Sequence, residues 1–126
     1  MDHSRSTTIE EIFTAEEIAA SGSAYSRVFD VSKLAGNASI QVELTGDGTG
    51  KIEWVGSNDE DAAVTAFIKP NNANDIVTAF TKTSGPGSDG KHIYPFSIRL
   101  IKNMAVKVTE TGGANSVTVT AILAVQ

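Results

Sequence analysis

The sequence predicts an all-β domain, an antiparallel β-sandwich or jelly roll of eight to nine short strands. The first observation behind this prediction is polarity that alternates with a period of two residues over several short segments, as in strands with one buried face. The second is a composition rich in Val, Ile, Thr, Ser and Gly, which favours strands and tight turns over helices. The third is the spacing of these segments, about 8–12 residues, which is typical of sandwiches.

Length and composition limit the function classes. The 126 residues fit one domain, and a hydrophobic content of 40% with 20% charged residues predicts a folded chain. The absence of cysteine from the sequence excludes disulfides, zinc–thiolate sites and cysteine nucleophiles. A net charge of −5 argues against nucleic acid as a partner, because phosphate recognition requires a basic surface.

The sequence also gives no reason to expect a membrane partner. Its apolar runs are shorter than the roughly 20 residues of a membrane-spanning helix. Residues 1–6 lack the apolar region of a secretory signal. We therefore expect a protein that is made as a soluble cytoplasmic product and that, if it leaves the cytoplasm, does so by a route other than the secretory signal.

We divide the chain into an N-terminal arm, residues 1–22, and a sandwich domain, residues 23–126. Two structures remain open within the arm. Residues 7–13 fit a short strand, whereas Thr14 and Glu17 form a capping box that favours a short helix. Such a helix would have only about two turns, which is marginal without tertiary packing.

From residue 23 onward, alternation predicts strands that are separated by turn residues. Trp54 is the expected anchor of the core, because a large aromatic side chain buries the most apolar area. Pro95 lacks an amide donor, so its strand is expected at a sheet edge or with a bulge. The stretch 75–83 fits a strand or a short helix, and we take it as a strand. The predicted strands cover residues 23–31, 38–45, 51–55, 62–69, 75–83, 91–101, 104–110 and 116–126.

Two glycine-rich turns are predicted to close β-hairpins. Residues 46–50 would join the predicted strands 38–45 and 51–55, and residues 111–115 would join the predicted strands 104–110 and 116–126. In the last strand, Ile122 and Ala124 add an apolar second face, so this strand is expected to be covered on both sides. The cover would be either a second sheet or a neighbouring subunit.

The loop from Gly85 to His92 comes close to two phosphate-binding motifs. It satisfies G-x-G-x-x-G, and it differs by one residue from the P-loop pattern G-x-x-x-x-G-K-[ST]. A phosphate-binding loop needs a helix that begins after the loop and a hydroxyl side chain that binds magnesium. Here His92 occupies the position of the hydroxyl residue, and Ile93–Phe96 has the pattern of a strand. We therefore interpret this segment as a loop between strands and expect no cofactor.

No catalytic or metal-binding constellation is predicted. The acidic run Asn58–Asp61 lacks the ligand spacing and closing glutamate of a calcium loop, so a solvated loop is favoured and a weak surface cation site is the alternative. Histidine occurs only at His3 and His92. Ser88 and Asp89 lie close to His92 in sequence, but hydrolytic triads are assembled from separated segments on a rigid frame. We therefore expect the chain not to be an enzyme.

Several stretches of the sequence have the same pattern of short strands and turns. They are Ser21–Ser26, Phe29–Ser32, Ile40–Thr49, Gly56–Asp59, Val108–Gly113 and Val119–Gln126. Together they resemble small β-sandwich virion proteins of tailed bacteriophages, of the head decoration or cement type. This resemblance covers most of the chain from about residue 21, and the glutamate-rich segment Ile9–Ile18 departs from it. It implies a non-enzymatic structural subunit of the virion. The alternatives are a tail or neck component and a glycan-binding or adhesion module, which would require an exposed aromatic residue or a calcium site.

A subunit of this kind is expected to form a homo-oligomer, a trimer, on a lattice of the major capsid protein or of other virion proteins. The expected contact segments are Asp2–Glu17 and Ser84–Lys91, because long polar segments order mainly against a partner. The residues singled out as partner contacts are Ile9, Phe13, Glu16, Glu17, Gly85, Gly87, Lys91 and Ile122.

Overall fold

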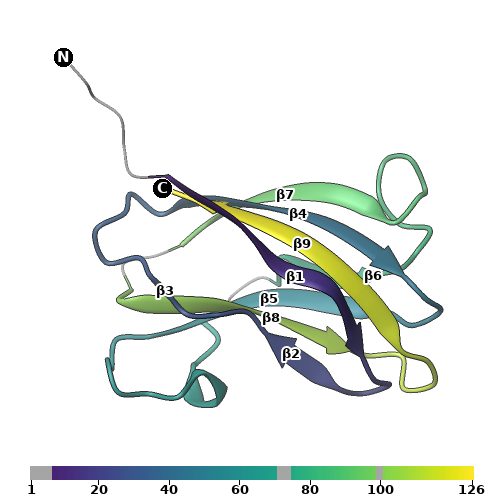
Figure 1. Ribbon diagram of the computed structural model, residues 1–126, viewed down its shortest axis with the longest axis horizontal. Coiled ribbons are helices and arrows are strands. Elements are labelled where there is room, and N and C mark those ends of the chain that lie inside the picture. The colour runs from purple at the N-terminus through teal and green to yellow at the C-terminus, as the bar shows by residue number, and fades with distance from the viewer. Residues whose placement is uncertain (1–6, 71–74, 99–100) are drawn as a thin grey trace.

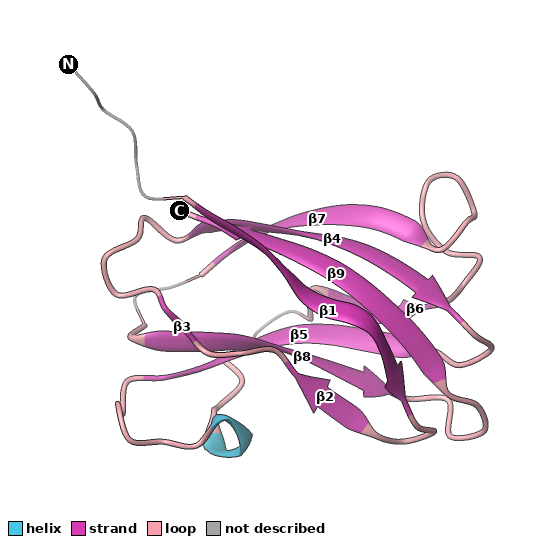
Figure 2. Ribbon diagram, viewed as in Figure 1, coloured by secondary structure: helices cyan, strands magenta, loops and turns pink. Residues whose placement is uncertain are grey.

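The computed structural model describes residues 7–70, 75–98 and 101–126. Within these ranges the chain forms nine strands and one 3-10 turn, and the strands lie in two layers (Figures 1 and 2). In chain order the elements are β1 (Thr8–Ile18), β2 (Ser23–Tyr25), β3 (Phe29–Asp30), β4 (Asn37–Thr45), β5 (Gly50–Ser57), η1 (Val64–Ala66), β6 (Val77–Phe80), β7 (Lys91–Ser97), β8 (Asn103–Glu110) and β9 (Val117–Val125). No helix in the described ranges is long and apolar enough to cross a membrane.

The strands form two antiparallel sheets that pack face to face. Sheet A has the strand order β1-β9-β4-β7. Sheet B has the order β2-β8-β5-β6, and the short β3 also pairs with β8. The predicted β-sandwich is therefore confirmed. Pro95 lies in β7 at an edge of sheet A, as expected for a residue without an amide donor.

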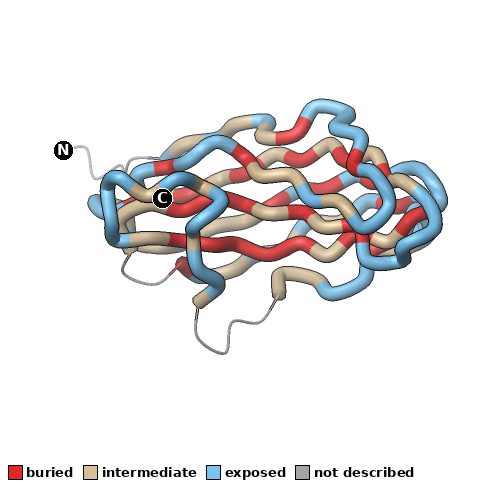
Figure 3. Tube along the Cα trace, turned by 90° about the horizontal axis from the view of Figure 1, so that it is seen from below, coloured by how far each residue is buried: buried red, intermediate tan, exposed pale blue. Residues whose placement is uncertain are grey.

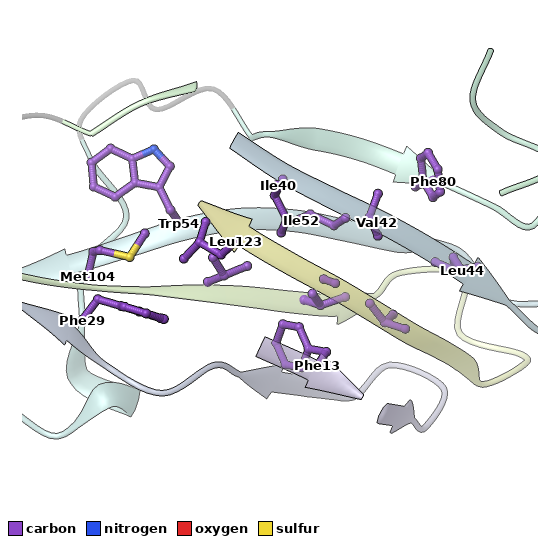
Figure 4. Close-up of a cluster of buried hydrophobic side chains, with 14 of the residues drawn as sticks. Phe13, Phe29, Ile40, Val42, Leu44, Ile52, Trp54, Phe80, Met104 and Leu123 are labelled. Atoms are coloured by element: carbon purple, nitrogen blue, oxygen red, sulfur yellow. The ribbon is translucent and has the colours of Figure 1, made fainter. Parts of the chain in front are cut away.

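The hydrophobic core lies between the two sheets. Ile40, Val42 and Leu44 alternate along β4 and are at most 1% exposed. Trp54 of β5 reaches the same cluster from sheet B, as predicted (Figure 4). Buried positions follow the middle of the strands, whereas the connections at both ends are mostly exposed (Figure 3). The burial of this apolar surface is the main source of stability.

Both predicted hairpins are wrong, because the strands on either side of each turn belong to different sheets. β4 pairs with β7 and β9, whereas β5 pairs with β6 and β8. In the same way, β8 lies in sheet B and β9 in sheet A. Alternation shows which side chains face inward, but not which strands are neighbours. A glycine-rich turn can span the roughly 10 Å between sheets as well as the roughly 4.8 Å between strands.

A buried carboxylate holds three of these connections together. Glu110 is 1% exposed, and its side chain accepts backbone hydrogen bonds of 2.7 to 3.0 Å from Ser21, Thr49, Gly112 and Gly113. These donors belong to the β1–β2, β4–β5 and β8–β9 connections. The amide of Thr49, followed by those of Ser21 and Gly113, lowers the pKa of Glu110 from 4.5 to about 2.

Of the two structures left open for the N-terminal arm, the strand is correct and the helix is wrong. β1 pairs with β9 from Thr8 to Ile18, with two register shifts between Glu11 and Glu16, so this segment belongs to the sandwich. The Thr14 hydroxyl donates to the Glu11 carboxylate at 2.6 Å instead of capping a helix, and Ala15 has a φ of +46°. Phe13 and Ile18 are buried in the core. Tertiary packing therefore overrides the local helix signal.

The predicted strand over residues 62–69 is wrong as well. β5 pairs with β8 along its length and with β6 only at Gly50 and Ile52, and the segment 62–69 contributes a single isolated bridge between Ile68 and Gly56. It also contains η1, which lies on the side of sheet B that faces away from sheet A (Figure 2). Val55 and Ala105, a cross-strand pair of β5 and β8, are buried although they lie outside the core cluster.

Two other predicted strands are shorter in the structure. The stretch 75–83 is a strand only over Val77–Phe80, and the stretch 23–31 is divided into β2 and β3. Arg99 and Leu100, which were expected to continue the strand that contains Pro95, lie outside the described residues.

Candidate functional site

The candidate functional site is the face of sheet A that points away from the core. Side chains alternate along each strand, so the residues between the buried ones form this outer face. The outer face consists of Ile9, Glu11 and Glu17 of β1, Thr118, Thr120, Ile122 and Ala124 of β9, Ser39, Gln41, Glu43 and Thr45 of β4, and Lys91, Ile93, Pro95 and Ser97 of β7.

An apolar stripe crosses this outer face from one edge of the sheet to the other. Ile9 on β1 is 70% exposed and Ile93 on β7 is 55% exposed, and these strands are the two edges of sheet A. Ile122 and Ala124 of the central strand β9 are half-buried between them. The strand registers place one row through Ile9, Ala124, Ser39 and Pro95, and the next row through Glu11, Ile122, Gln41 and Ile93.

The structure excludes one of the two covers that the sequence allowed for Ile122 and Ala124, a second sheet of the same chain. Sheet B packs against the opposite face of sheet A, so it cannot cover these side chains. The outer face of an antiparallel sandwich is usually polar. Exposed and half-buried apolar side chains on three of the four strands, β1, β9 and β7, are instead typical of an interaction site.

The charges of the outer face are distributed unevenly. Glu11 and Glu17 lie on β1, at one edge. Lys91 lies on β7, at the other edge, and its ammonium group is 3.4 Å from the carboxylate of Glu43. Both partners of this ion pair are exposed, so the pair contributes at most about 1 kcal/mol to stability. The outer face is therefore acidic at the β1 edge and carries its cation at the β7 edge.

A loop of residues 84–90 borders the outer face next to β7. The amide of Gly90 donates to the carbonyl of Ser84 at 2.8 Å and closes the loop. Gly85 has a φ of +94°, and a Cβ there would come within 2.1 Å of the Lys91 carbonyl oxygen, so this turn requires glycine. Loop and strands together line a shallow depression formed by Gln41, Pro86, Gly87, Asp89, Lys91, His92 and Ile93.

This geometry agrees with the interpretation of the glycine-rich motif as a loop between strands. Lys91 begins a strand rather than a helix, so no helix N-terminus lies behind the loop to hold a phosphate. His92 stacks on Tyr94 with ring centroids 4.0 Å apart, and its Nδ1 lies 2.9 Å from the Ile93 carbonyl oxygen. Burial raises the pKa of Tyr94.

The acidic run after β5 forms a turn in the structure. A carboxylate oxygen of Asp59 accepts a hydrogen bond of 2.9 Å from the amide of Asp61, which is the usual role of an aspartate at such a position. In the part of the chain that the structure describes, no three His, Asp or Glu side chains gather closely enough to hold a metal ion. His3 lies outside that part.

The structure brings several of the predicted contact residues together, although they are far apart in sequence. Glu16 and Glu17 are exposed near the end of β1. Phe13 is only 3% exposed and packs in the core, so its side chain is not available to a partner. The arm residues before Thr7 lie outside the described residues. Six predicted contacts lie on the outer face or in the loop beside it: Ile9, Glu17, Gly85, Gly87, Lys91 and Ile122.

Sequence reasoning did not single out the residues that β4 and β7 contribute to these two rows, Ser39, Gln41, Ile93 and Pro95. The sequence does contain a signal for Ile93. Side chains alternate between the two faces of a strand, so if Tyr94 points inward, Ile93 must point outward. The sequence does not reveal that β7 and β9 both pair with β4, and only this order of strands makes Ile93 part of the same stripe as Ile122.

No family model matches the chain, and a search of curated proteins finds no match. Solved structures share its fold. A structure of tripeptidyl peptidase 2 has a TM-score of 0.62 and 10% identity, and the match covers 98% of this chain but only 10% of the peptidase. The VP2 subviral particle of infectious bursal disease virus has a TM-score of 0.56 and 12% identity, and the match covers 95% of this chain and 32% of VP2.

A third similar structure is the SPBc2 prophage-derived protein YomS, with a TM-score of 0.46 and 16% identity over 94% of this chain and 93% of YomS. The similar structures thus include viral and prophage proteins as well as part of a peptidase. At these identities the similarity shows the sandwich fold alone, and the same fold hosts unrelated functions.

Proposed function

We propose that this chain is a non-enzymatic structural protein of a bacteriophage virion, a decoration or cement subunit that stabilises the head lattice. The observation that carries this proposal is the apolar stripe of Ile9, Ile93, Pro95, Ile122 and Ala124 on the outer face of sheet A. A broad, shallow apolar surface suits contact with another protein surface, whereas a small-molecule site is usually a concave pocket.

Two further observations support a structural role. The sandwich is built without any cysteine, so its stability comes from packing and from partners rather than from disulfides. The fold is also found in VP2, which was solved as a subviral particle. The proposed location is the virion, after synthesis in the host cytoplasm, and the proposed partners are further copies of the chain and the major capsid protein.

The decisive experiment is a cryo-electron-microscopy map of particles purified from the phage that carries the gene, together with mass spectrometry of their proteins. We expect the chain in many symmetric copies on the outside of the head. The same map tests the alternative of a tail or neck component, because it shows where the copies lie. Absence of the chain from purified particles would overturn the proposal in both forms.

A binding assay with variants then tests the surface itself. Purified protein is added to particles that lack it, and occupancy is measured for the wild type and for Ile122→Glu. We expect Ile122→Glu to abolish binding, because it places a charge in the centre of the apolar stripe. Ile68→Glu is the matched control, because Ile68 is 73% exposed but lies beside Gly56 of β5, in the other sheet. Equal binding of both variants would exclude the outer face of sheet A as the contact.

The proposed oligomer is a trimer, which native mass spectrometry of the purified chain measures directly. A trimer requires a heterologous interface, in which two different patches of the surface meet around a threefold axis. A monomer at high concentration, together with absence from particles, would refute the assembly role altogether.

A glycan-binding module is the second candidate, and one observation favours it. Tyr25 lies on the outer face of sheet B, where the Lys107 ammonium group is 5.4 Å from its ring centroid, so an aromatic ring is half-exposed beside a cation. Two further aspartates that could serve a calcium site have partners within the chain: Asp47 pairs with Lys82, and Asp89 accepts the Lys91 amide. A glycan array with and without calcium, repeated with Tyr25→Ala, tests this candidate.

A further inference from the structure

Each sheet has two edges at which a further strand could pair. Sheet A ends at β1 and β7 (Figure 1), and sheet B ends at β6 and, on its other side, at β2 and β3. β2, β3 and β6 have three, two and four residues, so they offer few backbone groups. β1 and β7 have eleven and seven residues. The edges of sheet A are therefore the places where an added strand would find the most partners.

The direction of the backbone groups in β7 follows from its pairing with β4. At one end, the amide of Leu44 donates to the carbonyl of Gly90 at 2.9 Å. At the other end, the amide of Ile98 donates to the carbonyl of Gly36 at 2.7 Å. The register between these two bonds has no shift, so the even-numbered residues face β4. The residues whose backbone groups point to the open edge are therefore Lys91, Ile93, Pro95 and Ser97.

Three local features block the open edge of β7. The amide of Lys91 already donates to the carboxylate of Asp89 at 3.2 Å. The ring Nδ1 of His92 lies 2.9 Å from the carbonyl oxygen of Ile93. Pro95 has no amide to donate. An added strand would find these partners taken or missing whatever its own sequence, so β7 is closed to strand addition.

The open edge of β1 lacks these features. Gln126 exchanges both backbone hydrogen bonds with Asn37 of β4, so the residue before it, Val125, faces β1, where its register partner is Thr8. The register is regular over the next three residues of β1. The residues whose backbone groups point to the open edge are therefore Ile9 and Glu11. Neither is a proline, and no side chain in the described ranges bonds to their backbone groups.

Charge controls which strand could pair with β1. Four glutamates lie along this strand, Glu10, Glu11, Glu16 and Glu17. In the part of the chain that the structure describes, only Glu10 has a cationic partner, the guanidinium of Arg27 at 2.7 Å. Antiparallel pairing with β1 of a second copy would set glutamates directly or diagonally opposite one another, which is unfavourable. A strand that carries Lys or Arg would instead meet the unpaired carboxylate of Glu11.

We propose that an extended basic segment of another protein adds to sheet A as a further strand, antiparallel to β1 at Ile9–Glu11. The register determines two positions of this segment. The residue opposite Glu11 is Lys or Arg, and two residues later a Val or Ile contacts the side chain of Ile9, which is 70% exposed. This inference goes beyond the proposed function, because it holds whether or not the chain is part of a virion.

An NMR titration of the isotope-labelled chain tests this inference. The probe is a short threonine-rich peptide that contains a lysine and, two residues later, a valine. We expect the amide signals of Ile9 and Glu11 to shift and to exchange more slowly with solvent, because both amides become hydrogen-bonded. The amide signals of Ile93 and Ser97, on the blocked edge, should not move. A control peptide with glutamate in place of the lysine should bind at least about tenfold more weakly.

Two variants separate the contribution of the backbone from that of the charge. Ile9→Pro removes an amide that faces the open edge and not β9, so the sandwich should fold and the peptide should no longer bind. Glu11→Lys should reverse the preference, so that the peptide with glutamate binds more tightly than the peptide with lysine. Circular dichroism checks that each variant is folded.

Three results would overturn the inference. They are unmoved amide signals of Ile9 and Glu11 with the lysine peptide, equal binding of the two peptides, and binding to Ile9→Pro as tight as to the wild type. If Ile9→Pro does not fold, Glu11→Lys decides, because an unchanged preference between the two peptides would also overturn the inference.

Discussion

The backbone amide of Thr49 donates a hydrogen bond of 2.9 Å to the carboxylate of Glu110, which lies 61 positions further along the chain. The same carboxylate accepts amides from the β1–β2 and β8–β9 connections. All three connections pass from one sheet to the other at the same end of the sandwich. Glu110 therefore supplies acceptors for backbone groups that no strand pairing satisfies.

Glu110→Gln is expected to destabilise the domain. The amide group that replaces one carboxylate oxygen carries two N–H donors, and these would face the backbone amides that now donate to Glu110. The hydrogen bonds that remain would also lose the charge that strengthens them. Thermal unfolding followed by circular dichroism should show a midpoint several degrees below that of the wild type.

The matched control for this change is Glu17→Gln, at an exposed position on β1. It removes the same charge without removing the acceptor of buried amides, so its unfolding midpoint should stay close to that of the wild type. Equal shifts for the two variants would mean that the net charge of the chain, and not the hydrogen bonds of Glu110, accounts for the effect.

The stability of the domain should fall at acid pH partly because of Glu110. Its pKa is about 2 in the folded chain and ordinarily 4.5, so the folded state prefers the ionised carboxylate. The stability that this preference contributes is fully present above pH 4.5 and is lost as the pH falls toward 2. Urea unfolding between pH 7 and pH 2 should therefore show a smaller loss for Glu110→Gln than for the wild type. Parallel curves for the two proteins would contradict this assignment.

The sequence predicts the fold class because alternation records which side chains are buried, as in Ile40, Val42 and Leu44 of β4. It does not predict which strands are neighbours. In the sequence, the turns after β4 and β8 look like hairpin turns. Glu110, whose carboxylate connects them, can be recognised as a hydrogen-bond acceptor only in the structure, where the amides of Ser21 and Thr49 donate to it.

The same limit applies to the candidate site. Ile122 stands out in sequence because it adds an apolar residue to the second face of its strand. The stripe that contains Ile122 is visible only once β1 is placed on one side of β9 and β4 and β7 on the other, because Ile9, Ile93 and Pro95 come from strands distant in sequence. Register is a long-range property, and local propensity carries no information about it.

Gly36→Ala is expected to destabilise the β3–β4 connection. Gly36 has a φ of +95°, and a Cβ there would come within 2.4 Å of the Ile98 carbonyl oxygen. The backbone of Gly36 also accepts a hydrogen bond of 2.7 Å from the Ile98 amide, so the loop cannot move away freely. We expect a loss of about 1–3 kcal/mol in the free energy of unfolding, measured by urea denaturation.

Gly87→Ala in the loop of residues 84–90 is the comparison for this change. A Cβ there would meet the Asp89 side chain at 3.2 Å, and that side chain can rotate away. Its effect should be small, within about 1 kcal/mol of the wild type in either direction. A larger loss for Gly87→Ala than for Gly36→Ala would show that the loop is held more rigidly than its contacts indicate.

Ile122 and Leu123 are neighbours on β9 whose side chains point to opposite faces of sheet A, and charging each should give different results. Leu123 is 1% exposed in the core, so Leu123→Ala should cost about 2–5 kcal/mol and Leu123→Glu should unfold the domain, because a carboxylate would be buried without a partner. Ile122 is half-buried on the outer face, so Ile122→Ala should cost about 1 kcal/mol or less and Ile122→Glu should remain folded. Urea denaturation measures the loss of stability in the Leu123 and Ile122 variants. Sedimentation at high concentration measures the loss of self-association in Ile122→Glu. Unfolding of Ile122→Glu would mean that the outer face is part of the stabilising core, and the stripe would then no longer serve as a free docking surface.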